Sequence, residues 1–117
     1  MTQSDLKQYV ERMVPLRQGK FNIQMVEGGT GPNLLFLHGA GGFTGWMPFL
    51  DRLSKDYHVY APAHPGVGDS EGLEHLDDLW DLTLFYEELM QELGLEHSFV
   101  IGHSYGGMLA AELAALR

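Results

Sequence analysis

The sequence predicts an α/β fold: a mostly parallel, twisted sheet with helices on both faces and an antiparallel hairpin at its start. Two short apolar runs, 34–37 and 98–101, are typical of strands that are covered on both faces. Segments with helical spacing of apolar residues alternate with the predicted strands from residue 34 onward. This alternation indicates right-handed crossovers within one parallel sheet. At 117 residues, the chain has room for one domain at most.

The first quarter of the chain predicts the hairpin. A polar start over about residues 2–12 is compatible with a short helix. Residues 13–17 and 21–26 then flank a turn at Gln18-Gly19. In the second of these segments apolar and polar residues alternate, which indicates a half-buried strand.

The remaining elements follow from spacing and stop signals. Apolar residues at i, i+3, i+4 and i+7 predict a helix over 46–53, and a short strand follows over 58–61. A long helical pattern covers 76–93 and an Ala/Leu-rich helix covers 105–117. Three aromatic residues at helical spacing are expected in the core and not in a cofactor site: Trp46, Trp80 and Phe85.

Composition excludes several classes of function. Seven basic against sixteen acidic residues give a net charge of −9 without a Lys/Arg cluster, so a nucleic-acid partner is not expected. Cysteine is absent, which excludes disulfides and thiolate metal sites. The start lacks a signal-peptide pattern, and its apolar runs are too short for a bilayer. We therefore expect a soluble, cytoplasmic protein without a membrane partner, and the sequence implies no cofactor or metal.

Glycine-bearing loops follow each of the predicted parallel strands, at 38–42, 65–70 and 102–107. In an open parallel sheet, ligands bind outside the carboxyl ends of the strands. We therefore expect these loops to converge on one crevice.

The segment from Gly102 to Gly106, Gly-His-Ser-Tyr-Gly, predicts a nucleophile elbow with Ser104 as the nucleophile. A serine on a sharp strand-to-helix turn adopts a strained backbone, and residues two positions away on either side must be small. Gly102 and Gly106 meet that requirement, and the helix that begins beside Ser104 favours a developing negative charge. The alternative is a chance match to this short pattern.

The loop at 38–42 has three interpretations. A nucleotide-binding turn is disfavoured, because neither of its glycine patterns is present. The preferred interpretation is an oxyanion hole, in which the backbone N–H of Ala40 joins that of Tyr105, with the adjacent Gly41 as an alternative donor. The remaining interpretation is a plain glycine turn. His38 and Gly39 would support the loop structurally.

Two other histidines flank these loops. His103 is adjacent to Ser104 and is expected to point away from it as a packing residue. His64 precedes Pro65 near the predicted crevice; the sequence favours an exposed loop histidine over one that lines the site.

Together, the His-Gly-Ala-Gly-Gly, Pro-Gly-Val-Gly-Asp-Ser and Gly-His-Ser-Tyr-Gly-Gly segments resemble the α/β-hydrolase superfamily of esterases, lipases and carbon–carbon bond hydrolases. The resemblance covers about residues 13–117. It implies strands one to five of an eight-stranded sheet, with the central strands in the order 4-3-5. One departure is that the family commonly carries Asp shortly before Pro-Gly, where this chain has Ala63 and His64.

A larger departure concerns the catalytic triad, whose order in this fold is Ser, then Asp or Glu, then His. No histidine follows Ser104, and the only acid that follows is Glu112. We therefore expect residues 1–117 to be the amino-terminal portion of a single α/β-hydrolase domain, truncated in the helix after the nucleophile. The resemblance implies a serine hydrolase that acts on a small-molecule ester or related acyl bond, with this portion inactive or very weak by itself. The alternatives are a non-catalytic binding module on the same scaffold and a chain that associates through its exposed strand edge.

Overall fold

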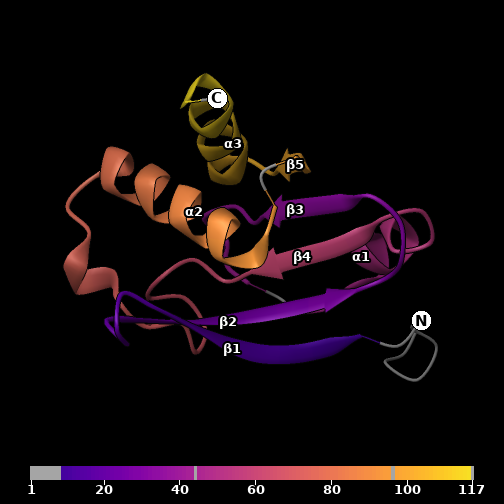
Figure 1. Ribbon diagram of the computed structural model, residues 1–117, viewed down its shortest axis with the longest axis horizontal. Helices are drawn as coiled ribbons and strands as arrows, with labels where there is room; N and C mark the ends of the chain where they lie inside the picture. Colours follow the sequence, from indigo (N-terminus) through magenta and orange to yellow (C-terminus); the bar gives the residue numbers. More distant parts are fainter. Residues whose placement is uncertain (1–8, 44, 96, 117) are drawn as a thin grey trace.

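The computed structural model describes residues 9–43, 45–95 and 97–116. They form a five-stranded sheet with helices on both of its faces (Figure 1). The strands are β1 (Val10–Leu16), β2 (Phe21–Gly28), β3 (Asn33–Leu37), β4 (His58–Pro62) and β5 (Phe99–Gly102). The helices are α1 (Pro48–Leu53), the 3₁₀ turn η2 (Leu73–His75), α2 (Leu79–Leu93) and α3 (Tyr105–Leu116).

The sheet has the strand order β1-β2-β4-β3-β5. β3 pairs in parallel with both β4 and β5, and β2 joins β1 and β4 in antiparallel pairs. The predicted fold class, the hairpin and the central order 4-3-5 are thus confirmed. Because β3, β4 and β5 run in the same direction, their carboxyl ends lie at one edge of the sheet.

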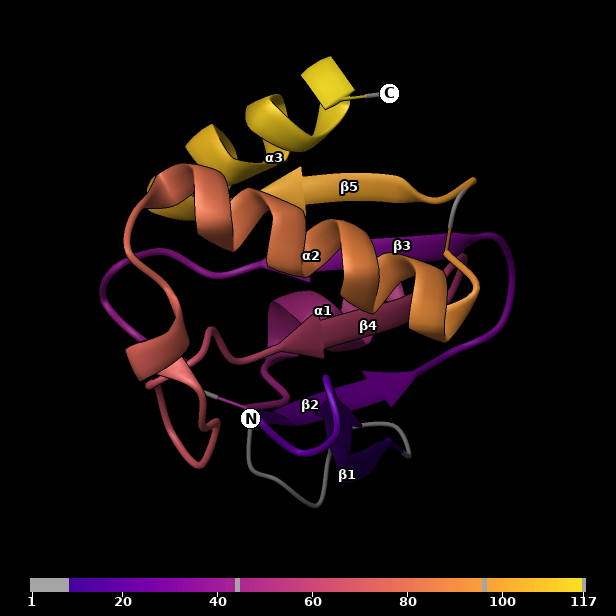
Figure 2. The ribbon, with the colours of Figure 1, turned by 60° about the vertical axis from the view of Figure 1, so that its left-hand side comes forward.

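The two faces of the sheet are covered by different helices. In Figure 2, α2 lies in front of the sheet and α1 lies behind it. Residues of α3 belong to the same core cluster as those of α2. The sheet has a hydrophobic core on each face, and alternate residues of β3 pack into each. Leu35 and Leu37 pack under α2 and α3, whereas Leu34 and Phe36 pack on the α1 side. Burial on both faces explains why this strand is a continuous apolar run.

The start of the described chain differs from the helix expected at about 2–12. Val10 already belongs to β1, whose register with β2 runs from Val10 opposite Glu27 to Leu16 opposite Phe21. Pairing with β2 overrides the polar local sequence at 10–12. Residues 2–8 lie outside the described residues.

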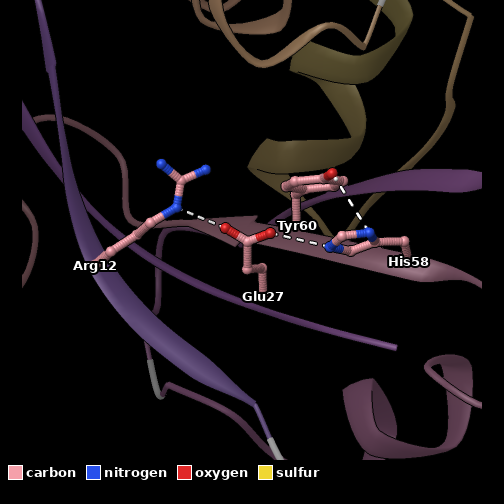
Figure 3. A network of polar contacts seen from close by, with 4 residues as sticks. All are labelled: Arg12, Glu27, His58 and Tyr60. Atoms are coloured by element: carbon pink, nitrogen blue, oxygen red, sulfur yellow. Dashed lines mark hydrogen bonds and ion pairs between the residues drawn. The ribbon is translucent and has the colours of Figure 1, made fainter. Parts of the chain in front are cut away.

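A polar network ties the first strands together at the end of the sheet away from the predicted loops (Figure 3). Glu27 accepts a hydrogen bond from Arg12 at 2.6 Å and lies 2.9 Å from Nε2 of His58. The His58 ring stacks on Tyr60, with 4.4 Å between centroids. These contacts link β1, β2 and β4.

Two expectations for buried residues are wrong. Trp80 is 52% exposed, because α2 begins only at Leu79, after the Asp78 cap, and turns Leu82, Phe85 and Leu89 toward the sheet instead. Phe99, expected in a buried strand, is 58% exposed, because β5 lies at the edge of the described sheet. Trp46 and Phe85 are buried as expected.

In the described part of the chain, no helix combines the length and apolar character needed to cross a membrane.

Candidate active site

The loops that follow β3, β4 and β5 meet at the carboxyl edge of the sheet. The contact is closest between Gly39 and the turn at 103–104. A Cβ added to Gly39 would lie 3.2 Å from Cβ of Ser104 and 2.9 Å from the carbonyl oxygen of His103. The parallel pairing of β3 with β5, which sets Leu37 opposite Gly102, places these loops side by side.

Ser104 has a left-handed backbone, with φ of 58°. Its side chain lies on an exposed turn between β5 and α3. A Cβ on Gly102 would collide with the carbonyl oxygen of Gly106, and a Cβ on Gly106 would collide with the carbonyl oxygen of Leu37. The glycines on either side of Ser104 are therefore required by packing, as the sequence predicts. Among the described residues, the Ser104 hydroxyl has no hydrogen-bond partner.

Free backbone donors surround this turn. Tyr105 is the first residue of α3, so its N–H has no partner within the helix. In the 38–42 loop, Gly42 donates to the carbonyl of Gly39, while the N–H groups of Ala40 and Gly41 have no acceptor among the described residues. The N–H groups of Ala40, Gly41 and Tyr105 are therefore available to a bound group.

A cavity of about 430 Å³ opens beside these donors. Ala40 and Tyr105 contribute to its wall, together with the 64–67 loop and residues around the start of α2. Most of the lining is apolar, with Leu73, Leu76 and Leu82 among the larger side chains. No group of three or more His, Asp or Glu side chains placed to hold a metal ion occurs within the described residues.

His64 is not the exposed loop histidine that the sequence favoured. It is only 6% exposed and lines the cavity, and its backbone N–H donates to Nε2 of His38 at 3.0 Å. It is buried because it lies two residues after the end of β4 and packs on the ring of His38, with 3.8 Å between centroids. His38 is also buried, and its Nδ1 lies 2.7 Å from the carbonyl oxygen of Gly39 in its own loop.

Tyr86 is the residue that the sequence analysis missed. It is fully buried in α2, and its hydroxyl lies 2.5 Å from Nδ1 of His64. The signal that could have found it is a tyrosine on the apolar stripe of a helix, since a buried hydroxyl needs a polar partner.

Burial suppresses charge in this cluster. Desolvation lowers the pKa of His64 to about 4, with a smaller contribution from the nearby His38. Desolvation also lowers the pKa of His38, against the opposing effect of its hydrogen bond to Gly39. The pKa of Tyr86 is raised well above its usual value, mainly by burial. At neutral pH both histidines and the tyrosine are therefore uncharged.

His103 does not have the packing role expected for it. Its side chain is exposed at the surface beside the Gly39 backbone. The residue contributes through its main chain, because its carbonyl oxygen accepts the N–H of Gly106 at 3.0 Å.

Comparison with known proteins places this geometry in context. A family model described as alpha/beta hydrolase fold matches residues 32–117. The chain is 39% identical over 89 residues to the dihydrolipoyllysine-residue acetyltransferase component of the acetoin cleaving system of Cupriavidus necator, covering 75% of this chain and 24% of that protein. It is 32% identical over 92 residues to (E)-2-((N-methylformamido)methylene)succinate hydrolase of Acinetobacter baylyi, covering 78% and 35% respectively.

A solved structure shows the same arrangement of elements. The crystal structure of E-2-(acetamidomethylene)succinate hydrolase superposes with a TM-score of 0.82 at 27% identity, covering 93% of this chain and 40% of that one. The chain thus spans between about a quarter and two fifths of the length of these proteins.

Proposed function

This chain belongs to the alpha/beta hydrolase fold family, and from that premise we propose that it supplies the nucleophile and the oxyanion hole of a serine hydrolase. Ser104 would be the nucleophile, and the N–H groups of Ala40 and Tyr105 would form the oxyanion hole, with His38, Gly39, Gly41, Gly102 and Gly106 as supporting residues. The substrate would be a small molecule with an ester or related acyl bond. Relatives of this chain include hydrolases, which supports the reaction class.

The observation that carries the proposal is the backbone of Ser104. A serine with φ of 58° between two glycines that packing requires is a strained turn, and such strain concentrates at functional sites. The turn also points the start of α3 at the site, which favours negative charge there.

The reaction would proceed in two steps. Oγ of Ser104 would bond to the carbonyl carbon while a base takes its proton, and the carbonyl electron pair would move to an oxygen held by the Ala40 and Tyr105 N–H groups. Collapse of this intermediate would expel the leaving group, which takes up the proton. Water would then attack the acyl-enzyme in the same way and release the acid with Ser104 restored.

The base is the part of the mechanism that the described residues do not supply. His38 and His64 are buried in hydrogen bonds of their own, and neither contacts Ser104. We infer that residues 1–117 form the amino-terminal portion of the catalytic domain, and that a histidine and an acid from a further segment complete it. By itself, this portion would turn over substrate very slowly.

The test uses a completed form of the protein, which carries the missing triad residues. It measures labelling of the serine by a fluorophosphonate probe, read by mass spectrometry, and hydrolysis of p-nitrophenyl acetate. We expect the adduct on Ser104, none in Ser104→Ala, and a loss of completed-form hydrolysis on the order of 10⁶-fold in that variant. His103→Ala is the matched control, since this exposed neighbour should leave both readouts unchanged. Hydrolysis that survives Ser104→Ala in the completed form would exclude Ser104 as the nucleophile.

A second candidate function is a non-catalytic binding module on the same scaffold. It is favoured by the Ser104 hydroxyl, which has no hydrogen-bond partner among the described residues and so no base to activate it. Failure of the probe to label Ser104 in the completed form would support this alternative.

A further inference from the structure

A buried chain of hydrogen bonds joins α2 to the loop after β3. Nδ1 of His64 lies 2.5 Å from the Tyr86 hydroxyl, and Nε2 of His64 lies 2.8 Å from the carbonyl oxygen of His38. The backbone N–H of His64 donates to Nε2 of His38 at 3.0 Å. Nδ1 of His38 lies 2.7 Å from the carbonyl oxygen of Gly39. The three side chains come from three different elements, and none contacts the Ser104 hydroxyl.

The partners determine where each proton lies. A carbonyl oxygen only accepts, so Nε2 of His64 must carry a proton toward His38 and Nδ1 of His38 must carry one toward Gly39. The Nε2 of His38 accepts a backbone N–H and is therefore unprotonated. Because His64 is neutral, its Nδ1 accepts, and the Tyr86 hydroxyl donates to it. In this one assignment every side-chain polar atom of the hydrogen-bond network has a partner, and both rings are neutral.

We propose that His64 is a positioning residue, which anchors the carbonyl of His38 to the buried Tyr86 and thereby fixes the 38–42 loop beside Ser104. This inference rests on the proposed function only in assigning an oxyanion role to that loop. The loop has few other restraints: Ala40 and Gly41 make no backbone hydrogen bonds to described residues, and a Cβ on Gly41 would meet nothing within 4 Å. The anchor, in contrast, is held by a tyrosine with no exposed surface.

Burial explains why the anchor holds at neutral pH. Protonation of His64 would force the Tyr86 hydroxyl to accept from Nδ1 and not donate to it, and no acidic side chain among the described residues contacts the ring to stabilise the charge. The groups that face His64 are the ring of His38, Tyr86 and, at 6.1 Å between centroids, Tyr105. Asp77 and Asp78, which precede the first residue of α2, line the same cavity. The lowered pKa of His64, about 4, agrees with a ring that stays neutral.

The first test needs no substitution. In a long-range proton–nitrogen spectrum of the 117-residue chain at pH 7, we expect the His64 proton on Nε2 and the His38 proton on Nδ1. The His64 ring, whose pKa is lowered to about 4, should remain neutral on titration down to about pH 5. A His64 ring that is protonated on Nδ1, or on both nitrogens, at pH 7 would overturn the proposal whether or not Ser104 is a nucleophile.

The second test compares two substitutions of similar size. In His64→Gln the amide nitrogen falls near the position of Nε2 and can still donate to the His38 carbonyl, whereas in His64→Asn it falls near Nδ1 and cannot reach it. We expect His64→Asn to shift the backbone amide resonances of residues 39–42, and His64→Gln to leave them close to wild type. Tyr60→Phe, which removes a hydroxyl on the other network, is the control and should not move them.

The same variants distinguish a positioning role of His64 from a purely structural role. In the completed form, His64→Asn should slow fluorophosphonate labelling of Ser104 by about tenfold or more, with His64→Gln restoring it, because small displacements of a catalytic loop are costly. Equal behaviour of the two variants in the amide spectra or in the labelling rate would overturn the positioning role. Absence of labelling in the wild type would instead contradict the proposed function, and the amide spectra would still decide the role of His64.

Discussion

Gly106 packs against the end of β3 so closely that the main chain occupies the space a side chain would need. An added Cβ would collide with the Leu37 carbonyl group and would lie 2.7 Å from the carbonyl oxygen of His38. These are backbone atoms of a central strand and the loop after it, so they cannot rotate away as a side chain would. The approach of α3 to β3 that sets Ser104 beside the 38–42 loop therefore depends on this glycine.

We expect Gly106→Ala to lower the free energy of unfolding by about 2 to 3 kcal/mol, the upper part of the range for overpacking. The measurement is urea unfolding followed by circular dichroism. Gly41→Ala is the matched control, because its Cβ would meet nothing within 4 Å and its backbone is not left-handed. That control should be neutral or slightly stabilising. Equal stability of the two variants would contradict the proposed packing.

At the same scale, His64 shows how burial alone changes the chemistry of a side chain. Its position next to Pro65 in a glycine-bearing loop favoured exposure, yet Ala63 and His64 continue the buried end of β4. Once the ring is enclosed, water can no longer satisfy its nitrogens, so each needs a partner from the protein. Tyr86 and His38 are those partners, and they hold the ring in one tautomer.

At the scale of elements, α2 shows which of its apolar side chains the fold buries. Leu82, Phe85 and Leu89 pack on the sheet, whereas Trp80 lies on the opposite, solvent-facing side. The Asp78 side chain accepts the N–H of Asp81 at 2.9 Å and so starts the helix at Leu79.

We expect Leu89→Ala to lower the free energy of unfolding by about 2 to 5 kcal/mol, because it empties a fully buried site. Trp80→Ala should change it by no more than about 0.5 kcal/mol, since the ring is half exposed and alanine is the better helix former. Thermal or urea unfolding of both variants checks this. A larger loss for Trp80→Ala than for Leu89→Ala would mean that α2 packs through the face that carries Trp80.

At the scale of the whole molecule, the two edges of the described sheet differ. β1 carries Glu11, Arg12 and Pro15, which are residue types that discourage pairing at an edge. β5 carries only Phe99, Val100, Ile101 and Gly102, and an apolar groove between α2 and α3 continues from it. Self-association through this edge, one of the alternatives that the sequence leaves open, remains a prediction.

We expect the average mass measured by light scattering to rise with the concentration of the 117-residue chain. Phe99→Lys should return it toward that of a monomer, because a charge at the edge resists burial in a pairing strand. Val10→Lys, at an exposed position of the opposite edge, should leave association unchanged. A wild-type chain that stays monomeric at every concentration would contradict association through β5.

The sequence by itself determined the order of the elements, the parallel centre of the sheet and the strained turn at Ser104. These features are encoded locally: strands and helices differ in apolar periodicity, and the space at Gly102 and Gly106 is a requirement of the turn itself. The positions of Ser104, Ala40 and Tyr105 at one edge then follow from topology, because parallel strands share a carboxyl edge.

Only the tertiary structure decided which side chains meet. The bonds between His38, His64 and Tyr86 join three elements that are distant in the chain, and no periodicity encodes such pairings. The exposure of Trp80 and Phe99 likewise depends on what packs against α2 and β5. The physical reason is that local sterics and spacing act over a few residues, whereas the burial that removes water from a side chain, and so selects its hydrogen-bond partners, is a property of the assembled fold.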